Sequence, residues 1–255
     1  MSTISSIDSQ GVLWFTINRR EKRNAINYEV MEALEATIKD AETNDQIKAV
    51  VLTGTGEEAF CSGGDLSIFH NLITESQAYD MLLRMGRILY KLLLLPKPTI
   101  ALLNGTALGG GCELATACDY RFATSTSKIG FIQGRLAITT GWGAATMLME
   151  KLPYEKALYL LTSSKVLSSI EAQQLGFVEQ VMDKEYIEDE LQKFLKPLVE
   201  QHANVIQAYK QVVTRKWEQI KLWDRMEEEI RMCAKLWEAP AHHEAVQLFL
   251  NKKQS

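Results

Sequence analysis

A run of three glycines followed closely by a glutamate is the part of this chain best suited to chemistry. Residues 109–111 follow an apolar run at residues 99–103, which predicts a buried strand, and lead into a predicted helix with Glu113 in its first turn. Backbone N–H groups without side-chain cover, helped by the positive end of a helix, suit a developing anion. Oxyanion donors beside an acid or base are the components of an acyl-group active site. The simpler alternative is that the glycines only permit close packing of the helix on the strand.

A second glycine motif occupies residues 62–65, which read SGGD. It follows a predicted strand at residues 49–54 and a turn, and Asp65 can cap a following helix. Alone, this motif indicates no more than a turn. Together with residues 109–111 it indicates more, because two such turns can each supply one N–H group to an oxyanion hole.

Other common site signatures are missing from the sequence. The glycines have neither the Gly-x-Gly-x-x-Gly spacing of a dinucleotide site nor the Gly-Lys-Ser/Thr of a P-loop, and no Gly-x-Ser-x-Gly elbow of a serine hydrolase occurs. The histidines form no ligand set with nearby cysteines or carboxylates, so we expect no metal; they are His70, His202, His242 and His243.

The combination and order of four segments resemble the crotonase (enoyl-CoA hydratase/isomerase) superfamily. The segments are 21–27 (EKRNAIN), 60–66 (FCSGGDL), 104–113 (NGTALGGGCE) and 169–178 (SIEAQQLGFV). The resemblance runs from about Val12 to the last predicted helix. It implies a spiral of repeated β-β-α units with a helical C-terminal region, an acyl-CoA substrate and an enzyme, either a lyase or an isomerase.

The resemblance also implies roles for particular residues. Gly64 and Gly110 match the positions whose N–H groups hold the thioester oxygen as an enolate forms. Glu113 matches the first of two glutamates that hydratases use, one to activate water and one to deliver a proton. Gln133 stands where the second is expected, and a glutamine cannot cycle a proton at neutral pH. Hydration and isomerisation both commonly need that second carboxylate.

A decarboxylase of malonyl-type CoA thioesters is therefore the alternative reaction. Loss of CO₂ generates the enolate without a base, and a neutral Gln133 would not repel the departing carboxylate as a glutamate would. The stretches 107–121 and 127–129 are similar to the ethylmalonyl-CoA decarboxylase branch, which also lacks the second glutamate. A slow hydratase stays open. Residues 139–144 (TTGWGA) lack a proline and a glycine common in the family, which indicates either altered substrate positioning or neutral change.

Coenzyme A is expected as part of the substrate, with no separate cofactor. Arg23 lies where a basic residue could meet a phosphate, although a solvated surface arginine is equally consistent. By resemblance, Ala25, Ser62 and Leu66 border the path of the coenzyme. Lys210 could also touch a phosphate, but charges on a helix face are usually solvated.

Composition is typical of a water-exposed globular protein. The chain has 255 residues, 46% hydrophobic and 24% charged, and a net charge of −4, which argues against a nucleic-acid partner. No apolar run approaches the ~20 residues of a membrane span, and the N-terminus shows no targeting signal. The four cysteines have no Cys-x-x-Cys spacing and are expected as free thiols in the cytoplasm.

The positioning elements follow an α/β order. Strands are predicted at 11–18, 49–54, 99–103, 120–123, 128–132 and 177–181. Helices are predicted at 28–43, 75–95, 113–118, 185–200, 204–233 and 239–252. We divide the chain into an acyl-CoA-binding core, residues 1–195, and a C-terminal helical region, residues 196–255.

The C-terminal region carries an apolar stripe made of Leu222, Trp223, Met226, Ile230, Cys233 and Trp237. It suits the interface of a homotrimer or of a dimer of trimers, which the resemblance implies; packing on the chain's own core is the alternative. A crotonase-like fold kept as a binding or scaffold subunit is a further alternative, which the intact glycine turns and Glu113 argue against.

Overall fold

The structure, a computed structural model that describes residues 1–251, is built on a six-stranded sheet. The strand order is β1-β2-β3-β5-β7-β10, and only the β1–β2 pair is antiparallel. The strands are β1 (Thr3–Ile7), β2 (Val12–Ile17), β3 (Ala49–Gly54), β5 (Thr99–Leu103), β7 (Tyr120–Thr124) and β10 (Gln180–Met182). Parallel neighbours place the ends of β3 and β5, from which both glycine motifs follow, at the same edge.

A second sheet makes the repeat visible. Its order is β4-β6-β8-β9, with β4 (Ala59–Cys61), β6 (Thr106–Leu108), β8 (Lys128–Gly130) and β9 (Leu167–Ser168). Each of β3, β5 and β7 is followed by one strand of this sheet and then by at least one helix. The expected repeat of β-β-α units is thus confirmed. The units end in α3 (Glu75–Leu94), α4 (Gly110–Ala117) and α5 (Ala144–Lys151).

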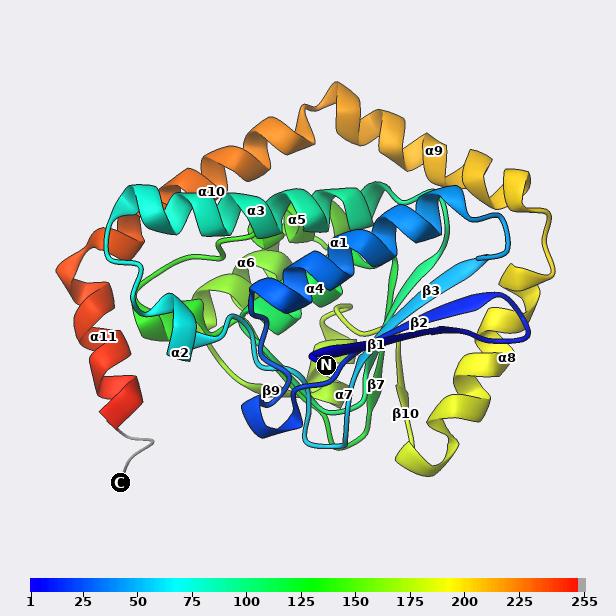
Figure 1. Ribbon diagram of the computed structural model, residues 1–255, viewed down its shortest axis with the longest axis horizontal. Coiled ribbons are helices and arrows are strands. Elements are labelled where there is room, and N and C mark those ends of the chain that lie inside the picture. The colour runs from blue at the N-terminus through cyan, green and yellow to red at the C-terminus, as the bar shows by residue number, and fades with distance from the viewer. Residues whose placement is uncertain (252–255) are drawn as a thin grey trace.

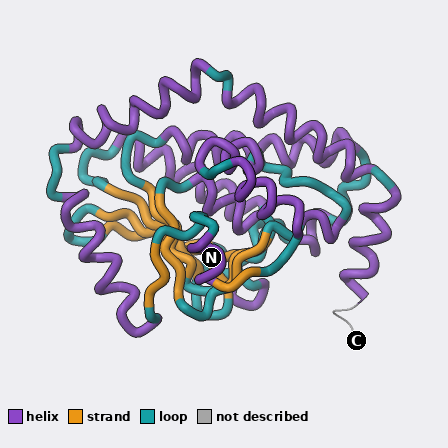
Figure 2. The backbone as a smooth tube through the Cα atoms, turned by 180° about the vertical axis from the view of Figure 1, so that it is seen from behind, coloured by secondary structure: helices purple, strands orange, loops and turns teal. Residues whose placement is uncertain are grey.

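Helices cover both faces of the large sheet because its strands alternate two sets of apolar side chains. Phe15 and Ala101 face the main core, while Val12 and Ile100 face a smaller cluster closed by α8 (Ile187–Val199). In Figure 1, α1 (Tyr28–Thr43), α3 and α10 run together above the strands, with α8 and α11 at opposite ends. Figure 2 shows the strands gathered in one part of the molecule under the helices. The remaining helices are α2 (Leu66–Phe69), α6 (Tyr154–Ser163), α7 (Ser169–Gln174), α9 (Ala203–Gln219), α10 (Leu222–Glu238) and α11 (Pro240–Asn251), with short 3₁₀ turns at Arg20–Lys22, Gln133–Leu136 and Lys184–Tyr186.

Long elements were well predicted and short ones were not. The predicted helix at 28–43 and strands at 49–54 and 99–103 match the observed bounds. Four strands of two to five residues, β1, β4, β6 and β9, carry too few apolar positions to show a period and were missed. The predicted helix 239–252 is α11, and Lys252 lies outside the described residues.

The prediction of one helix over 204–233 is wrong. The helix is interrupted between α9 and α10 at Ile220 and Lys221, where Lys221 takes the left-handed conformation with φ of 50°. No glycine or proline marks the break, so helical periodicity continues through it. After this break, α10 runs alongside α3 (Figure 1).

The apolar stripe of α10 packs on the chain's own core. Met226, Ile230 and Cys233 are fully buried, and a Cβ added to Gly86 of α3 would lie 2.4 Å from Ile230 Cδ1. The alternative of internal packing therefore holds for these residues of the stripe, whereas Trp223 is half-buried. Residue 195, where we divide the chain, lies within α8, and α10 shares the main core with α3.

Among residues 1–251, no helix is both long and apolar enough to cross a membrane. The four cysteines are free and buried.

Candidate active site

The two glycine motifs meet in space. A Cβ added to Gly63 would lie 3.0 Å from the backbone N of Gly110 and 3.2 Å from the carbonyl O of Leu108. Gly63 and Gly109 have φ of 98° and 53°, a conformation that side chains other than glycine's adopt only with strain. Gly64 and Gly110, 46 residues apart in sequence, therefore belong to two turns that lie side by side, as expected of two turns that each supply one N–H group.

The N–H groups of Gly64 and Gly110 are available to a ligand. Within residues 1–251, neither group donates to a backbone or side-chain acceptor. Gly110 is the first residue of α4, where the N–H groups of a helix have no partner in the helix itself and carry partial positive charge. The two N–H groups can donate to one oxygen that gains negative charge.

Close packing also requires glycine at residues 110 and 111. The expectation that these glycines permit the helix to pack on the strand is therefore compatible with an oxyanion role. A Cβ on Gly110 would lie 2.2 Å from the indole of Trp142, and a Cβ on Gly111 would lie 2.0 Å from the carbonyl O of Cys61. The first contact seats Trp142 directly on the oxyanion turn. The second seats α4 on β4.

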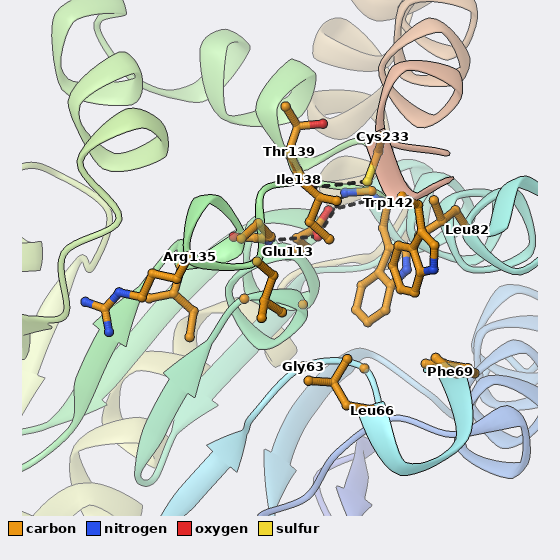
Figure 3. A pocket seen from close by; sticks show the side chains of 18 of the residues that line it. Gly63, Leu66, Phe69, Leu82, Glu113, Arg135, Ile138, Thr139, Trp142 and Cys233 are labelled. Atoms are coloured by element: carbon orange, nitrogen blue, oxygen red, sulfur yellow. Dashed lines mark hydrogen bonds between the residues drawn. The ribbon is translucent and has the colours of Figure 1, made fainter. Parts of the chain in front are cut away.

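A cavity of about 480 Å³ opens beside both turns. Figure 3 shows Gly63, Leu66 and Phe69 on one wall, facing Glu113, Trp142 and Cys233 on the other. Most of its lining is apolar, with α10 and α11 contributing Trp237, Ala245 and Leu248. Among the described lining residues Glu113 is the single carboxyl group and Arg135 the single cation.

Glu113 is held by donors from two segments. Its Oε1 accepts from the N–H of Gly141 (3.2 Å) and from Nε2 of Gln133 (3.0 Å), and its Oε2 accepts from the N–H of Trp142 (2.8 Å). The residue is 3% exposed. Burial, followed by the negative charge of Glu229, raises the pKa of Glu113 from its ordinary 4.5 to about 7, against the lowering effect of the three hydrogen bonds. Near neutral pH this carboxyl group can both donate and accept a proton.

Gln133 lies next to Glu113, as the family resemblance implied, but only half of its amide is used. Its Nε2 donates to Glu113, while its Oε1 is buried with no hydrogen-bond partner among residues 1–251. A buried carbonyl without a donor is uncommon in folded proteins. The cavity thus contains one unused acceptor next to the carboxyl group of Glu113.

The segment that binds Glu113 is fixed from α10. Glu229 accepts from the N–H groups of Ala145 (3.0 Å) and Thr146 (2.7 Å) and from the hydroxyl of Thr140. These residues flank Gly141 and Trp142 on both sides. The sequence analysis missed Glu229, and no local pattern marks it, since its partners lie 83 to 89 residues away.

The residues expected to meet coenzyme A divide into two groups. Ser62 and Leu66 line the cavity. Arg23 and Ala25 are not among its lining residues, but the N–H of Ser62 donates to the carbonyl of Arg23 at 3.1 Å, which places their segment next to the motif. The Arg23 side chain is exposed. Lys210 forms an ion pair with Asp119 at 2.6 Å away from the cavity, so the structure does not place it at this site.

An ion pair that the sequence analysis missed orders the same region. Arg19 pairs with Asp65 at 2.7 Å and also donates to the carbonyl of Ala25 at 2.6 Å. Asp65 accepts from the N–H of Ser67, which confirms its expected role as the cap of α2. Arg19 therefore ties the 23–25 segment to the end of the SGGD motif. No group of His, Cys, Asp or Glu within residues 1–251 is arranged to hold a metal ion.

The sequence profile described as enoyl-CoA hydratase/isomerase matches residues 8–255. The chain is 37% identical over 180 residues to YngF of Bacillus subtilis, named among the enoyl-CoA hydratases/isomerases, covering 71% of this chain and 69% of that protein. It is 31% identical over 201 residues to the short-chain-enoyl-CoA hydratase of Clostridium acetobutylicum, covering 78% and 76%. It is 32% identical over 244 residues to the ethylmalonyl-CoA decarboxylase of Gallus gallus, covering 94% and 81%.

The fold has close counterparts among solved structures. The enoyl-CoA hydratase of Bacillus halodurans superposes with a TM-score of 0.89 at 23% identity, covering 97% of this chain and 100% of that one. At this identity the likeness concerns the fold alone.

Proposed function

Since this chain belongs to the enoyl-CoA hydratase/isomerase family, the crotonase superfamily, we propose that it binds an acyl-CoA thioester with the thioester oxygen between the N–H groups of Gly64 and Gly110. These donors stabilise the enolate formed during the reaction. Backbone donors are held in place by the fold before the reaction begins, and removing one typically lowers the rate by about 10²–10³. Ser62 and Leu66 lie along the acyl-CoA, and the exposed Arg23 is near enough to the motif to meet a phosphate.

Of the reactions that pass through such an enolate, decarboxylation of a malonyl-type thioester is best supported. The observation that carries this choice is the single carboxyl group among the described residues of the cavity, Glu113, paired with a neutral Gln133. Addition of water across a double bond needs one group to activate water and another to supply a proton. Decarboxylation needs an oxyanion hole and one proton donor. The match to an ethylmalonyl-CoA decarboxylase over nearly the whole chain supports the same choice.

The proposed step balances with the residues present. The bond between the α-carbon and the substrate carboxylate breaks, CO₂ leaves, and the electron pair moves into the enolate held by Gly64 and Gly110. Protonated Glu113 then gives its proton to the α-carbon and is reprotonated from solvent. Because Oε1 of Glu113 already accepts two hydrogen bonds and Oε2 accepts one, the acidic proton belongs on Oε2.

Hydration with one carboxyl group is the second candidate, and one observation favours it. The unused Oε1 of Gln133 is an acceptor beside Glu113, so the two side chains could hold a water molecule between them. The similarity to a short-chain-enoyl-CoA hydratase supports this candidate.

Incubation with ethylmalonyl-CoA and, separately, with crotonyl-CoA in D₂O separates the two, read by mass spectrometry. We expect loss of CO₂ with one deuterium gained at the α-carbon of the first substrate and little change in the second. Rapid gain of one D₂O by crotonyl-CoA with ethylmalonyl-CoA intact would overturn the decarboxylase assignment and leave hydration.

The proposal extends to assembly as a homotrimer or dimer of trimers in the cytoplasm. With the α10 stripe buried, the support comes from α9, where Val205, Tyr209 and Val212 are 44%, 76% and 67% exposed at a spacing that puts them on one face. Exposed apolar side chains gathered on one helix face are typical of a contact surface.

A further inference from the structure

The carboxyl group of Glu229 on α10 is turned inward, and among residues 1–251 no cation is bound to it. Its carboxylate accepts three hydrogen bonds, from Thr140, Ala145 and Thr146, and burial raises its pKa. The nearby Arg225, one turn earlier on α10, is paired with Glu150 instead. The favourable partner of Glu229 is the N-terminus of α5, whose N–H groups it caps.

The segment capped by Glu229 is the one that binds Glu113. Thr140 lies directly before Gly141 and Trp142, whose N–H groups donate to Glu113, and Ala145 and Thr146 lie just after them. Cys233, one turn after Glu229 on α10, donates to the carbonyl of Thr139 at 3.3 Å. Residues 139–146 are thus held from α10 at both ends and hold Glu113 in the middle.

We propose that Glu229 is a positioning residue for Glu113: it fixes residues 139–146 in the arrangement in which Gly141 and Trp142 bind the Glu113 carboxyl group. The negative charge of Glu229 also raises the pKa of Glu113, second to burial, while the three hydrogen bonds lower it. Burial and Glu229 thus act together against the hydrogen bonds, and both favour the acid needed for proton delivery. Only the last clause rests on the proposed function.

The other groups that face Glu113 place no negative charge near it. Cys112 on α4 and Cys233 on α10 are thiols whose pKa values burial raises, so both are neutral. Gln133 is neutral, and α3 presents Met81 and Leu82 to the cavity. The guanidinium of Arg135 is exposed and donates to the carbonyl of Ser164.

The test is a titration of Glu113 itself, followed by ¹³C NMR of glutamate-labelled protein, with Glu113→Gln used to assign the signal. Glu229→Gln keeps the length of the side chain and removes the charge, so the pKa of Glu113 should fall by roughly one pH unit, the size of a single like-charge effect in a protein interior. Glu228→Gln is the matched control, because Glu228 is the neighbouring residue on α10 and is exposed. It should leave the titration of Glu113 unchanged.

Glu229→Asp provides the second variant, and it keeps the charge while shortening the reach to Ala145 and Thr146. It should retain a high pKa at Glu113 but lower kcat several-fold, since the segment is released. An unchanged Glu113 titration in Glu229→Gln, or an equal shift in Glu228→Gln, would overturn the proposal. The titration needs no turnover, so a wild-type protein inactive on every thioester would refute the proposed function and still leave this result readable.

Discussion

Glu113 should lower the stability of the folded protein at alkaline pH, and Glu113→Gln should relieve that effect. A pKa of about 7 in the folded state against 4.5 as the ordinary value means that folding favours the protonated form. The contribution of this group to stability is fully present below about pH 4.5 and is lost as the pH rises through about 7. Above that pH the folded protein must hold a buried carboxylate.

The size of the effect follows from the same two values. At about 1.4 kcal/mol per pH unit, the difference between 4.5 and about 7 corresponds to about 3 kcal/mol at pH 8.5. A glutamine has one acceptor oxygen for the donors that now share two, and an unmet hydrogen bond costs about 1 kcal/mol. The net gain for Glu113→Gln at pH 8.5 should be about 2 kcal/mol, which raises Tm by about 5 °C in a chain of this size.

Urea unfolding of both proteins at pH 5 and pH 8.5, at equal protein concentration, measures this difference. The variant should be close to the wild type at pH 5 and more stable at pH 8.5, while its turnover falls by about 10²–10⁴ through loss of the proton donor. Glu228→Gln, on the exposed face of α10, should change neither quantity. A Glu113→Gln protein that is no more stable than the wild type at pH 8.5 would refute the conclusion that burial raises the pKa of Glu113.

Four further measurements test the proposed reaction and assembly. Decarboxylation should fall about tenfold per pH unit above about pH 7, as Glu113 loses its proton, and a flat rate to pH 9 would contradict it. Gln133→Glu should slow loss of CO₂, because a new carboxylate would face that of the substrate; a variant that loses CO₂ as fast as the wild type and hydrates a short enoyl-CoA faster would favour a hydratase. Gly64→Pro, which removes one N–H group, should lose about 10²–10³ in turnover while Gly64→Ala, with the same added Cβ 3.1 Å from Phe69, loses less; equal losses would argue against an oxyanion role. Light scattering should give a trimer or hexamer that Val212→Asp weakens, and a strictly monomeric wild type would contradict it.

Gly64 is the better position for removing a donor, although Gly110 offers the same chemistry. Any side chain at Gly110 would meet the Trp142 indole at 2.2 Å, so lost turnover there could reflect a displaced tryptophan. Around Gly64 the nearest atoms are those of the Phe69 ring, which can give way, and the alanine control carries the same contact.

The sequence predicts helices and strands whose burial shows as a regular pattern of apolar residues. The strand at 49–54 is a continuous apolar run because it is buried on both faces, and the helix at 28–43 shows its buried side at helical spacing. The break at Lys221 has no such signal. Lysine rarely adopts a positive φ, and the packing of α10 on α3 imposes this conformation on Lys221. Packing between distant segments leaves no periodic pattern in the sequence.

The candidate site shows the same division. Gly64, Gly110 and Glu113 could be predicted to lie together because each sits where a strand ends and a helix begins, and parallel strands bring such positions to one edge. The placement of Gln133 beside Glu113 followed from the family resemblance. Arg19 and Glu229 could not be predicted, since each is an ordinary charged residue whose partner lies 46 or more residues away.

Of the missed residues, Glu229 bears on the proposed role of Glu113 as an acid. The glycine motifs alone would build an oxyanion hole with Glu113 held by N–H donors, which favour a carboxylate and hence a low pKa. A proton donor at neutral pH requires an opposing influence, and this chain supplies two, enclosure by apolar side chains from α3 and α10 and the negative charge of Glu229. The charge and part of the enclosure come from α10, far along the chain from the glycine motifs. Under the proposed reaction, α10 is therefore part of the chemistry, because it helps a motif that could stabilise an anion to return a proton as well.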